Sequence, residues 1–248
     1  MILISPAKRL TSKLSDRKLV STEAFFKDDA NLLARKLSKL SSLDLQKMMG
    51  ISEDIADLNQ QRFKNWDKPE AIEKRAIFQF EGDVFKNLDA KSLEDEDLEY
   101  MNENLRILSG IYGLLRPSDK MNPYRLEMGT KSLPGDLKSL YDFWGDRVAN
   151  QLKNEAGENL IFNLASDEYF TVVKKFVDLD KIANFKFYTQ KDGVEKVIGV
   201  IAKRVRGEMA RFLIRNRIKT IEPIKAFDSM GFEFREVTGN EIIFVQKG

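Results

Sequence analysis

Two hairpin signals near the end of the chain constrain the fold more than any other sequence feature. Residues 185–202, FKFYTQKDGVEKVIGVIA, carry a turn signal at Asp192-Gly193, and residues 232–246, FEFREVTGNEIIFVQ, carry another near Gly239-Asn240. Turns of this kind join neighbouring antiparallel strands. Two of them argue against a doubly wound parallel sheet, so the sequence predicts the α+β class.

The other segments alternate irregularly between strand-like and helix-like patterns. Strands are predicted at 1–5, 76–80, 105–110 and 159–163, and helices at 23–39, 43–49, 53–65, 137–157, 202–218 and from residue 94 onward. Thr22 is the expected N-cap of the first helix, and Ser166 is the expected N-cap of a helix after 159–163. No repeat, linker or boundary interrupts the chain. We therefore expect a single domain over residues 1–248 with a mixed sheet.

The 248 residues include neither cysteine nor histidine. This excludes disulfides, thiolate nucleophiles, thiolate zinc sites, iron–sulfur clusters and histidine bases. Only hard cations with oxygen ligands, such as magnesium, remain compatible with the composition. We predict no metal site and no cofactor, and composition identifies no catalytic residue.

The charges of the chain almost balance. Lysine and arginine number 41 against 39 aspartates and glutamates, so the formal net charge is +2. A nucleic-acid partner would therefore depend on local clusters of basic residues. No apolar run reaches the about 18 residues of a membrane span, and the N-terminal MILISPAK lacks the features of a signal peptide. We expect a cytoplasmic protein without a membrane partner.

Residues 45–59, LQKMMGISEDIADLN, have the spacing of a helix-hairpin-helix, whose usual core is L-x-x-L-P-G-I-G-x-x-x-A. Gly50 can take positive φ in the turn, and Ser52 can cap the second helix. Amides at the start of that helix would then be available to phosphate. The alternative is an ordinary capped helix pair, since Glu53 and Asp54 bring negative charge. For an element at about 43–65, the DNA-binding candidates are Lys47, Met49, Gly50, Ile51, Ser52, Arg62 and Lys64.

A long basic helix is predicted around KRVRGEMARFLIRNRIK, residues 203–219. At 100° per residue, Arg204, Arg211 and Arg215 share one face with Glu208, beside an apolar arc. Guanidinium groups bind phosphate in bidentate fashion and stay charged, so the stripe suits phosphate. The alternative is a solvated face neutralised by the acidic stretch at 94–99.

The stretch SGIYGLLRPSDKMNPYRLEMGT, residues 109–130, combines an apolar start with a constrained polar loop. Period-two alternation over 124–128 predicts a strand that places Arg125 and Glu127 on one face. Such a polar face requires either a cleft or a buried structural ion pair, and both remain open. Other strand ends supply further polar groups: Ser5 and Lys8 after the first strand, and Asn163, Ser166 and Tyr169 after 159–163.

Six segments together resemble the YaaA family of bacterial peroxide-stress proteins. They are MILISPAK, LSGIYGLLRP, NPYRLEMGTK, LYDFWGD, NLASDEYF and KRVRGEMARF, and they run in matching order from residue 1 to about 237. The resemblance implies a cytosolic protein with an unusual single-domain α+β fold that binds DNA through a helix-hairpin-helix. It also implies a link to protection from peroxide through lowered free intracellular iron.

By position, the resemblance places the hairpin on 49–52 and a basic cleft on Lys8, Arg116, Arg125, Lys203, Arg206 and Arg211. Departures from the family pattern are Arg9, where threonine is usual, and Val205 and Glu208, in a helix that usually runs K-K-A-R-G-L-M. With the residues singled out above, the candidate cleft for DNA or another anion comprises Lys8, Arg116, Tyr124, Arg125, Glu127, Ser166, Lys203, Arg204, Arg206, Arg211 and Arg215.

Two functions follow from these features. The first is binding of double-stranded or distorted DNA without chemistry, largely independent of base sequence because amides and arginines contact phosphate. The alternative is an enzyme acting on a nucleotide or another phosphorylated small molecule in the same cleft, with Glu127 or Tyr169 as acid or base. Location separates them, because DNA needs one continuous exposed surface and a small substrate needs a convergent pocket.

Overall fold

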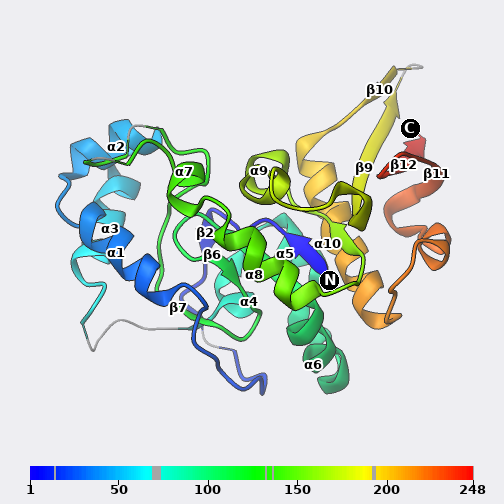
Figure 1. Cartoon of the computed structure of the whole chain (residues 1–248), viewed down its shortest axis with the longest axis horizontal. Coiled ribbons are helices and arrows are strands. Elements are labelled where there is room, and N and C mark those ends of the chain that lie inside the picture. The colour runs from blue at the N-terminus through cyan, green and yellow to red at the C-terminus, as the bar shows by residue number, and fades with distance from the viewer. Residues whose placement is uncertain (14, 69–73, 132, 136, 192–193, 248) are drawn as a thin grey trace.

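A mixed sheet forms the centre of the computed structural model, which describes residues 1–13, 15–68, 74–131, 133–135, 137–191 and 194–247 (Figure 1). Over these residues, eight strands pair in the order β11-β12-β9-β8-β1-β5-β6, with β10 attached to β9. Their bounds are β1 Ile2–Ile4, β5 Leu105–Ser109, β6 Gly113–Leu115, β8 Ile161–Asn163, β9 Ile182–Lys191, β10 Val194–Lys196, β11 Phe232–Thr238 and β12 Glu241–Lys247.

Strand directions confirm the α+β class with a mixed sheet. The neighbours β5, β1, β8, β9 and β12 are parallel, whereas β6, β10 and β11 run antiparallel to their partners. The hairpin at Gly239-Asn240 is confirmed as β11–β12. The antiparallel pairing of β9 with β10 agrees with the other signal, whose turn residues Asp192 and Gly193 lie outside the described residues.

Helices surround this sheet, and α1–α3 lie beyond it at one end of the molecule (Figure 1). Their bounds are α1 Lys27–Leu37, α2 Ser42–Met49, α3 Glu53–Lys64, α4 Ala76–Gln79, α5 Asp83–Leu88, α6 Asp95–Asn104, α7 Leu140–Trp144, α8 Arg147–Ala156, α9 Asp167–Lys174 and α10 Gly199–Arg215. Short 3₁₀ turns lie at Ala90–Ser92, Leu179–Lys181, Glu222–Ala226 and Ser229–Gly231, and small strand pairs join β2 Arg9–Leu10 to β4 Phe80–Glu81 and β3 Lys74–Arg75 to β7 Lys120–Met121. Helices α1–α3 occupy one end of the long axis, and β9, β11 and β12 lie toward the other (Figure 1).

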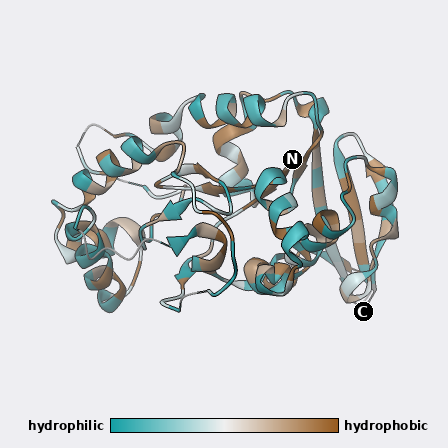
Figure 2. Ribbon diagram, turned by 90° about the horizontal axis from the view of Figure 1, so that it is seen from below, coloured by the Kyte–Doolittle hydropathy of each residue, from teal (hydrophilic) through white to brown (hydrophobic). Residues whose placement is uncertain are grey.

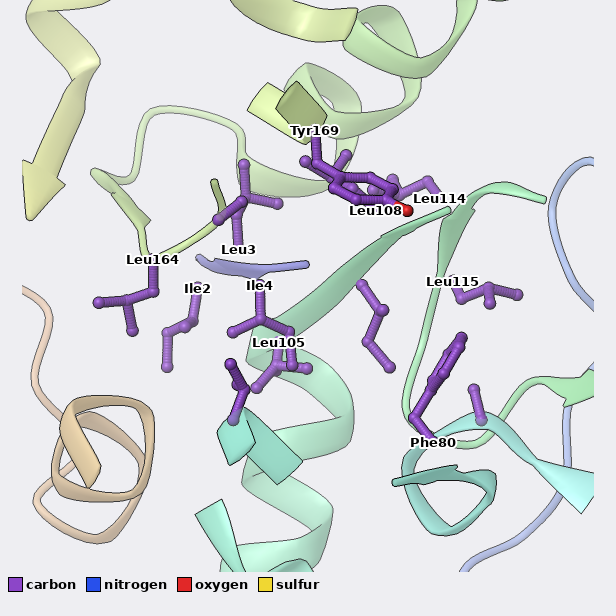
Figure 3. Close-up of a cluster of buried hydrophobic side chains, with 14 of the residues drawn as sticks. Ile2, Leu3, Ile4, Phe80, Leu105, Leu108, Leu114, Leu115, Leu164 and Tyr169 are labelled. Atoms are coloured by element: carbon purple, nitrogen blue, oxygen red, sulfur yellow. The ribbon is translucent and has the colours of Figure 1, made fainter. Parts of the chain in front are cut away.

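The core is built on both faces of the parallel strands. In Figure 3, Leu3 points to one side of β1, toward Tyr169, while Ile2 and Ile4 point to the other. All three residues of β1 are buried, as parallel strands covered on both faces require. Figure 2 shows hydrophobic segments along the strands beside the N-terminus and mixed hydropathy along the surrounding helices. Among the described residues, no helix is long and apolar enough to span a membrane.

The structure corrects the boundaries of two predicted helices. The first helix begins at Lys27 and not at residue 23, because Thr22 is bound elsewhere, by hydrogen bonds to Ser118 and Asp119. The predicted helix over 137–157 is two helices, α7 and α8, because Gly145 takes a positive φ of 52° and ends the first.

Two predicted strands are also wrong. Residues 76–79 form the short helix α4, which is buried on every side, and an apolar run this short has no periodicity to distinguish the two states. Residues 124–128 alternate between buried and half-buried side chains as predicted, yet they form no strand, because no strand among the described residues pairs with them. The alternation therefore reflects packing of an extended segment on the core.

Candidate functional site

A pocket lies at the carboxyl ends of the two central parallel strands, β1 and β8. From β1 the chain passes to β5 on one side of the sheet, and from β8 it passes to β9 on the other side. Connections that leave neighbouring strands in opposite directions open a crevice at the carboxyl edge, the usual ligand site of such sheets. The fold therefore places the loops after β1 and β8 where a ligand site is expected.

The pocket has a volume of about 330 Å³. Five segments line it: the loop after β1, the residues around the start of α5, the extended segment that carries Glu127, the residues around the start of α9, and one face of α10. The lining residues are Ser5, Pro6, Ala7, Lys8, Arg9, Glu81, Gly82, Asp83, Val84, Phe85, Lys86, Glu127, Leu164, Ser166, Glu168, Tyr169, Lys203 and Arg206.

Glu127 forms one wall of the pocket and holds two cations. Its carboxylate lies 2.6 Å from the Lys8 Nζ and 3.2 Å from the Arg125 guanidinium. Lys8 is largely exposed, whereas the Arg125 and Glu127 side chains are 19% and 24% exposed. Glu127 thus joins an exposed lysine to a mostly covered arginine, which itself does not line the pocket.

Two serine hydroxyls connect the loops after β1 and β8. The Ser5 hydroxyl accepts a 2.8 Å hydrogen bond from the Ser166 amide and donates to the Ser166 hydroxyl oxygen at 3.2 Å. Because a hydroxyl has one proton, the Ser166 proton is left to donate to another acceptor. Ser166 is the N-cap residue of α9, as predicted, but its side chain makes no capping hydrogen bond.

Helix α10 contributes two cations to the opposite wall, Lys203 and Arg206. Neither makes an ion pair with any residue in the described part of the chain, and the Arg206 Nε is buried without a hydrogen-bond partner there. Burial lowers the pKa of Arg206, and the Asp167 carboxylate opposes this effect. A guanidinium remains charged at neutral pH, so the pocket contains an uncompensated positive charge.

Most other charged side chains in the lining have a partner or are exposed; the exception is Glu81, which is half-buried and forms no ion pair with a described residue. Glu168 accepts a 2.9 Å hydrogen bond from the Gly129 amide, and Asp83 lies 3.9 Å from the Arg204 guanidinium. Arg9 and Lys86 are exposed at the rim. The pocket is therefore mixed in charge, with the free positive charge concentrated on the α10 side.

The two tyrosines considered for the site are kept neutral by burial. Burial raises the pKa of Tyr169 well above its usual range, and the neighbouring Tyr124, Glu168 and Glu127 add to the effect. Burial likewise raises the pKa of Tyr124, which is fully enclosed, bonds the Ser109 hydroxyl at 2.6 Å and does not reach the pocket. Because its pKa is raised, the Tyr169 hydroxyl stays protonated at neutral pH and cannot act as a base there. Tyr169 can therefore contribute to the pocket only as a neutral hydrogen-bonding group.

Several predicted cleft residues lie elsewhere. Arg116 donates hydrogen bonds to the Asp119 carboxylate and the Glu23 carbonyl oxygen and lies over the Phe25 ring, and it does not line the pocket. Arg211 donates to the carbonyl groups of Leu88 and Asp89. Arg211 and Arg215 line a separate surface groove with Glu208, and Arg204 faces Asp83. Of the predicted cleft, the structure brings together Lys8, Glu127, Ser166, Lys203 and Arg206.

The predicted helix pair at 43–65 is present as α2 and α3. Gly50 joins them with φ 61° and ψ 44°, the left-handed conformation that glycine adopts without strain. Ser41 caps α2 with a reciprocal Asp44 bond, while Ser52 precedes α3 without a side-chain capping bond. Lys47, Ser52 and Lys64 are exposed, Met49 and Arg62 are half-buried, and Ile51 is buried between the helices.

The sequence analysis missed the contribution of Glu81, Gly82 and Asp83 and the following turn of α5. Glu81 ends β4, Gly82 is the N-cap of α5 and Asp83 begins that helix, which is the same strand-to-helix arrangement found after β8. The predicted strand at 76–80 already ended beside them. A search for polar residues after every predicted strand would therefore have included this segment.

Comparison with known proteins agrees with the resemblance. A family model described as peroxide stress protein YaaA matches residues 1–238. A UPF0246 protein of Clostridium beijerinckii is 41% identical over 97% of this chain and 95% of its own. A UPF0246 protein of Aliivibrio fischeri is 42% identical over 98% and 97%, and one of Saccharophagus degradans is 39% identical over 100% and 99%. Over nearly its whole length, the chain belongs to the YaaA family of peroxide stress proteins.

Proposed function

We propose that the protein binds DNA largely without sequence specificity, as a cytosolic component of the peroxide-stress response that helps limit oxidative damage. The observation that carries the proposal is the turn between α2 and α3. Gly50 takes the left-handed conformation there, and the Ser52 side chain leaves the first amides of α3 without a capping bond. Amides at a helix start attract phosphate because of their orientation and the helix dipole.

Cations on α2 and in the last turn of α3 support the same proposal. Lys47 and Lys64 are exposed, and burial lowers the pKa of the half-buried Arg62, which nevertheless remains charged. Glu53 and Asp54 begin α3, so the attraction depends on amides and lysines together. Contacts of this kind are made to the phosphate backbone and carry little base information.

Substitution of Gly50 tests the proposal. A β-carbon at Gly50 would meet no atom within 4 Å, so a substitution there acts through backbone strain and not through a steric clash. We expect Gly50→Val to lower the unfolding free energy by about 1–3 kcal/mol and to weaken duplex binding in an electrophoretic or anisotropy assay. Asparagine tolerates left-handed geometry, so Gly50→Asn is the matched control and should bind almost normally. Full affinity in Gly50→Val would remove α2–α3 as the DNA contact.

A second candidate function is action on a phosphorylated small molecule in the pocket between β1, β8 and α10. The convergence of Lys8, Glu127, Ser166, Lys203 and Arg206 from separate segments favours it. Helices α2 and α3 lie at the other end of the long axis from the β9 side of α10 (Figure 1). The two functions therefore depend on different parts of the molecule and can be tested independently.

A further inference from the structure

We infer that the pocket at the carboxyl edge of β1 and β8 binds the phosphate group of a small phosphorylated molecule about the size of a nucleoside monophosphate, with Arg206 as the principal phosphate contact. The inference rests on the second candidate function and gives it a ligand class. It concerns binding alone and requires no chemical step.

Arg206 is the main reason for this inference, because no described residue near it pairs with its charge or accepts a hydrogen bond from its Nε. Its Nε is buried without a hydrogen-bond partner in the described residues, and no carboxylate there forms an ion pair with it. A partly covered, unpartnered charge costs stability, and such groups are found where an incoming ligand supplies the partner. The guanidinium fork matches two oxygens of one phosphate.

The other groups on this side of the pocket are hydrogen-bond donors and cations that lack an anionic partner among the described residues. Lys203 lies one turn earlier on α10 and makes no ion pair with a described residue. The Ser166 hydroxyl has a proton that Ser5 does not accept, and the first amides of α9 begin at the same residue. A helix start, a hydroxyl and two cations together form a phosphate site that is complete except for the anion.

The negative charges nearby do not cancel this set. Glu127 is engaged by Lys8 and Arg125, and Glu168 accepts from the Gly129 amide. Asp167, on the exposed side of α9, is the acid that acts on Arg206, without forming a hydrogen bond to it. Glu81 also lines the pocket and forms no ion pair with a described residue, so an anion would meet free donors on the α10 side and one unpaired carboxylate, Glu81, beside α5.

The volume of the pocket and its apolar lining residues indicate what is attached to the phosphate group of the ligand. A volume of about 330 Å³ is at the lower end of the roughly 300–1,000 Å³ of small-molecule sites, so one nucleotide fits and a duplex does not. Val84, Phe85 and Leu164 supply an apolar wall beside the polar groups. This combination suits a phosphate joined to a ring system. A nucleotide turned out of a DNA strand would present the same chemistry as a free nucleotide.

Thermal melting and calorimetry with inorganic phosphate and adenosine 5′-monophosphate test the inference. Both should raise the melting temperature of the wild-type protein, because a ligand that binds only the folded state stabilises it. Arg206→Met should weaken binding of both by about 10- to 100-fold, as expected for lost charge-assisted hydrogen bonds. Arg215→Met, an exposed arginine on the same helix outside the pocket, is the matched control and should bind normally.

The melting temperature without ligand provides an independent check on Arg206. Because its charge is partly buried and unpartnered, Arg206→Met should melt at the same or a higher temperature than wild type. A clear fall would assign Arg206 a structural role and overturn the inference, as would equal ligand effects in Arg206→Met and wild type. Absence of any shift with phosphate or the nucleotide in the wild-type protein would also overturn it.

Duplex and gapped DNA distinguish the two sources of the phosphate. An Arg206-dependent shift with gapped DNA and none with the free nucleotide would assign the pocket to a nucleotide within DNA and reject a free small molecule. Nucleotide binding without turnover would support the inference and remove the enzymatic function. The effect of Gly50→Val on duplex binding tests only the DNA contact at α2–α3, whereas Arg206→Met tests only the pocket. Either proposal can therefore be rejected without affecting the other.

Discussion

Glu127 shows how one side chain connects the surface of the pocket to the core. It joins Lys8, which is mostly in solvent, to Arg125, which is four-fifths covered and whose Nε has no hydrogen-bond partner in the described chain. The arginine therefore depends on this one carboxylate. The sequence pattern predicted that Arg125 and Glu127 share a face, and the structure adds that the pair is neither fully buried nor fully solvated.

We expect Glu127→Gln to lower the unfolding free energy by about 1–2 kcal/mol in urea titrations. Loss of the charge leaves Arg125 uncompensated, while solvent screens Lys8, so the cost lies between those of buried and exposed pairs. Glu158→Gln is the control, because the Glu158–Lys181 pair has the same 2.6 Å distance but Glu158 is 94% exposed. Equal losses in the two variants would mean that water compensates Arg125.

At the scale of elements, α10 and α5 approach each other closely at Gly207. A β-carbon there would collide with the Val84 carbonyl oxygen and lie 2.8 Å from the Asn87 β-carbon. Val84 and Phe85 line the pocket from α5, and Arg206 lines it from α10. The missing side chain at Gly207 thus determines the width of the pocket.

Substitution of Gly207 should separate the two helices. We expect Gly207→Ala to cost about 1–3 kcal/mol in unfolding free energy, as overpacking does, and to weaken any Arg206-dependent ligand binding. Gly199→Ala, at the start of the same helix, meets no atom within 4 Å and should be neutral or slightly stabilising. If both variants were equally stable, α5 would have moved without cost, and the close approach would not be a structural requirement.

The elements that the sequence predicted best are those whose signals are local. The hairpin β11–β12, the helices α2 and α3 and the basic helix α10 depend on turn residues and periodicity within one segment. The sequence could not predict that β1 pairs with β5 and β8, because parallel pairing is set by residues far apart in the chain. The short helix α4 was missed because four buried residues contain no period.

The candidate site was predictable only in part for the same reason. Polar residues after β1 and β8 were identified because each follows an apolar strand. Ser5, Lys8, Ser166 and Tyr169 line the pocket, whereas Asn163 lies outside the lining and donates to the Asn184 side chain. The arginine stripe on α10 was misplaced, since helical geometry alone does not say which face meets a neighbour. Packing against α5 turns Arg206 and Lys203 toward the pocket and leaves Arg215 outside.

At the scale of the whole molecule, charge is nearly balanced, so attraction to DNA has to arise locally. The net charge of +2 gives little long-range steering. The helices α2 and α3, which carry exposed lysines, lie at one end of the long axis, away from β9, β11 and β12 (Figure 1). DNA binding through this end should depend on few phosphates and respond to removal of single lysines.

We expect the affinity for duplex DNA to fall with salt with a log–log slope of about −3.6, which corresponds to about four phosphates. The double variant Lys47→Gln, Lys64→Gln should reduce the slope to about −1.8, because each lost cation removes one phosphate contact. Lys174→Gln with Lys175→Gln changes the net charge equally at the end of α9 and serves as the control. A flat titration in the wild-type protein would exclude electrostatic binding.

The position of β1 also governs the order in which the chain can fold. Its three residues are made well before their partners in the sheet, which begin at Leu105 and Ile161. Until Ile161–Asn163 leaves the ribosome, the middle of the sheet cannot close, and contacts this distant in sequence form slowly. The apolar segment at Ile2–Ile4 therefore lacks its β8 neighbour until Ile161–Asn163 has been made, and an uncovered strand is exposed to aggregation during this time. Among the strand pairs of the described central sheet, β1 and β8 are separated by the longest stretch of chain, so the strand that anchors the pocket in the finished protein is completed on both edges only after the longest interval of synthesis.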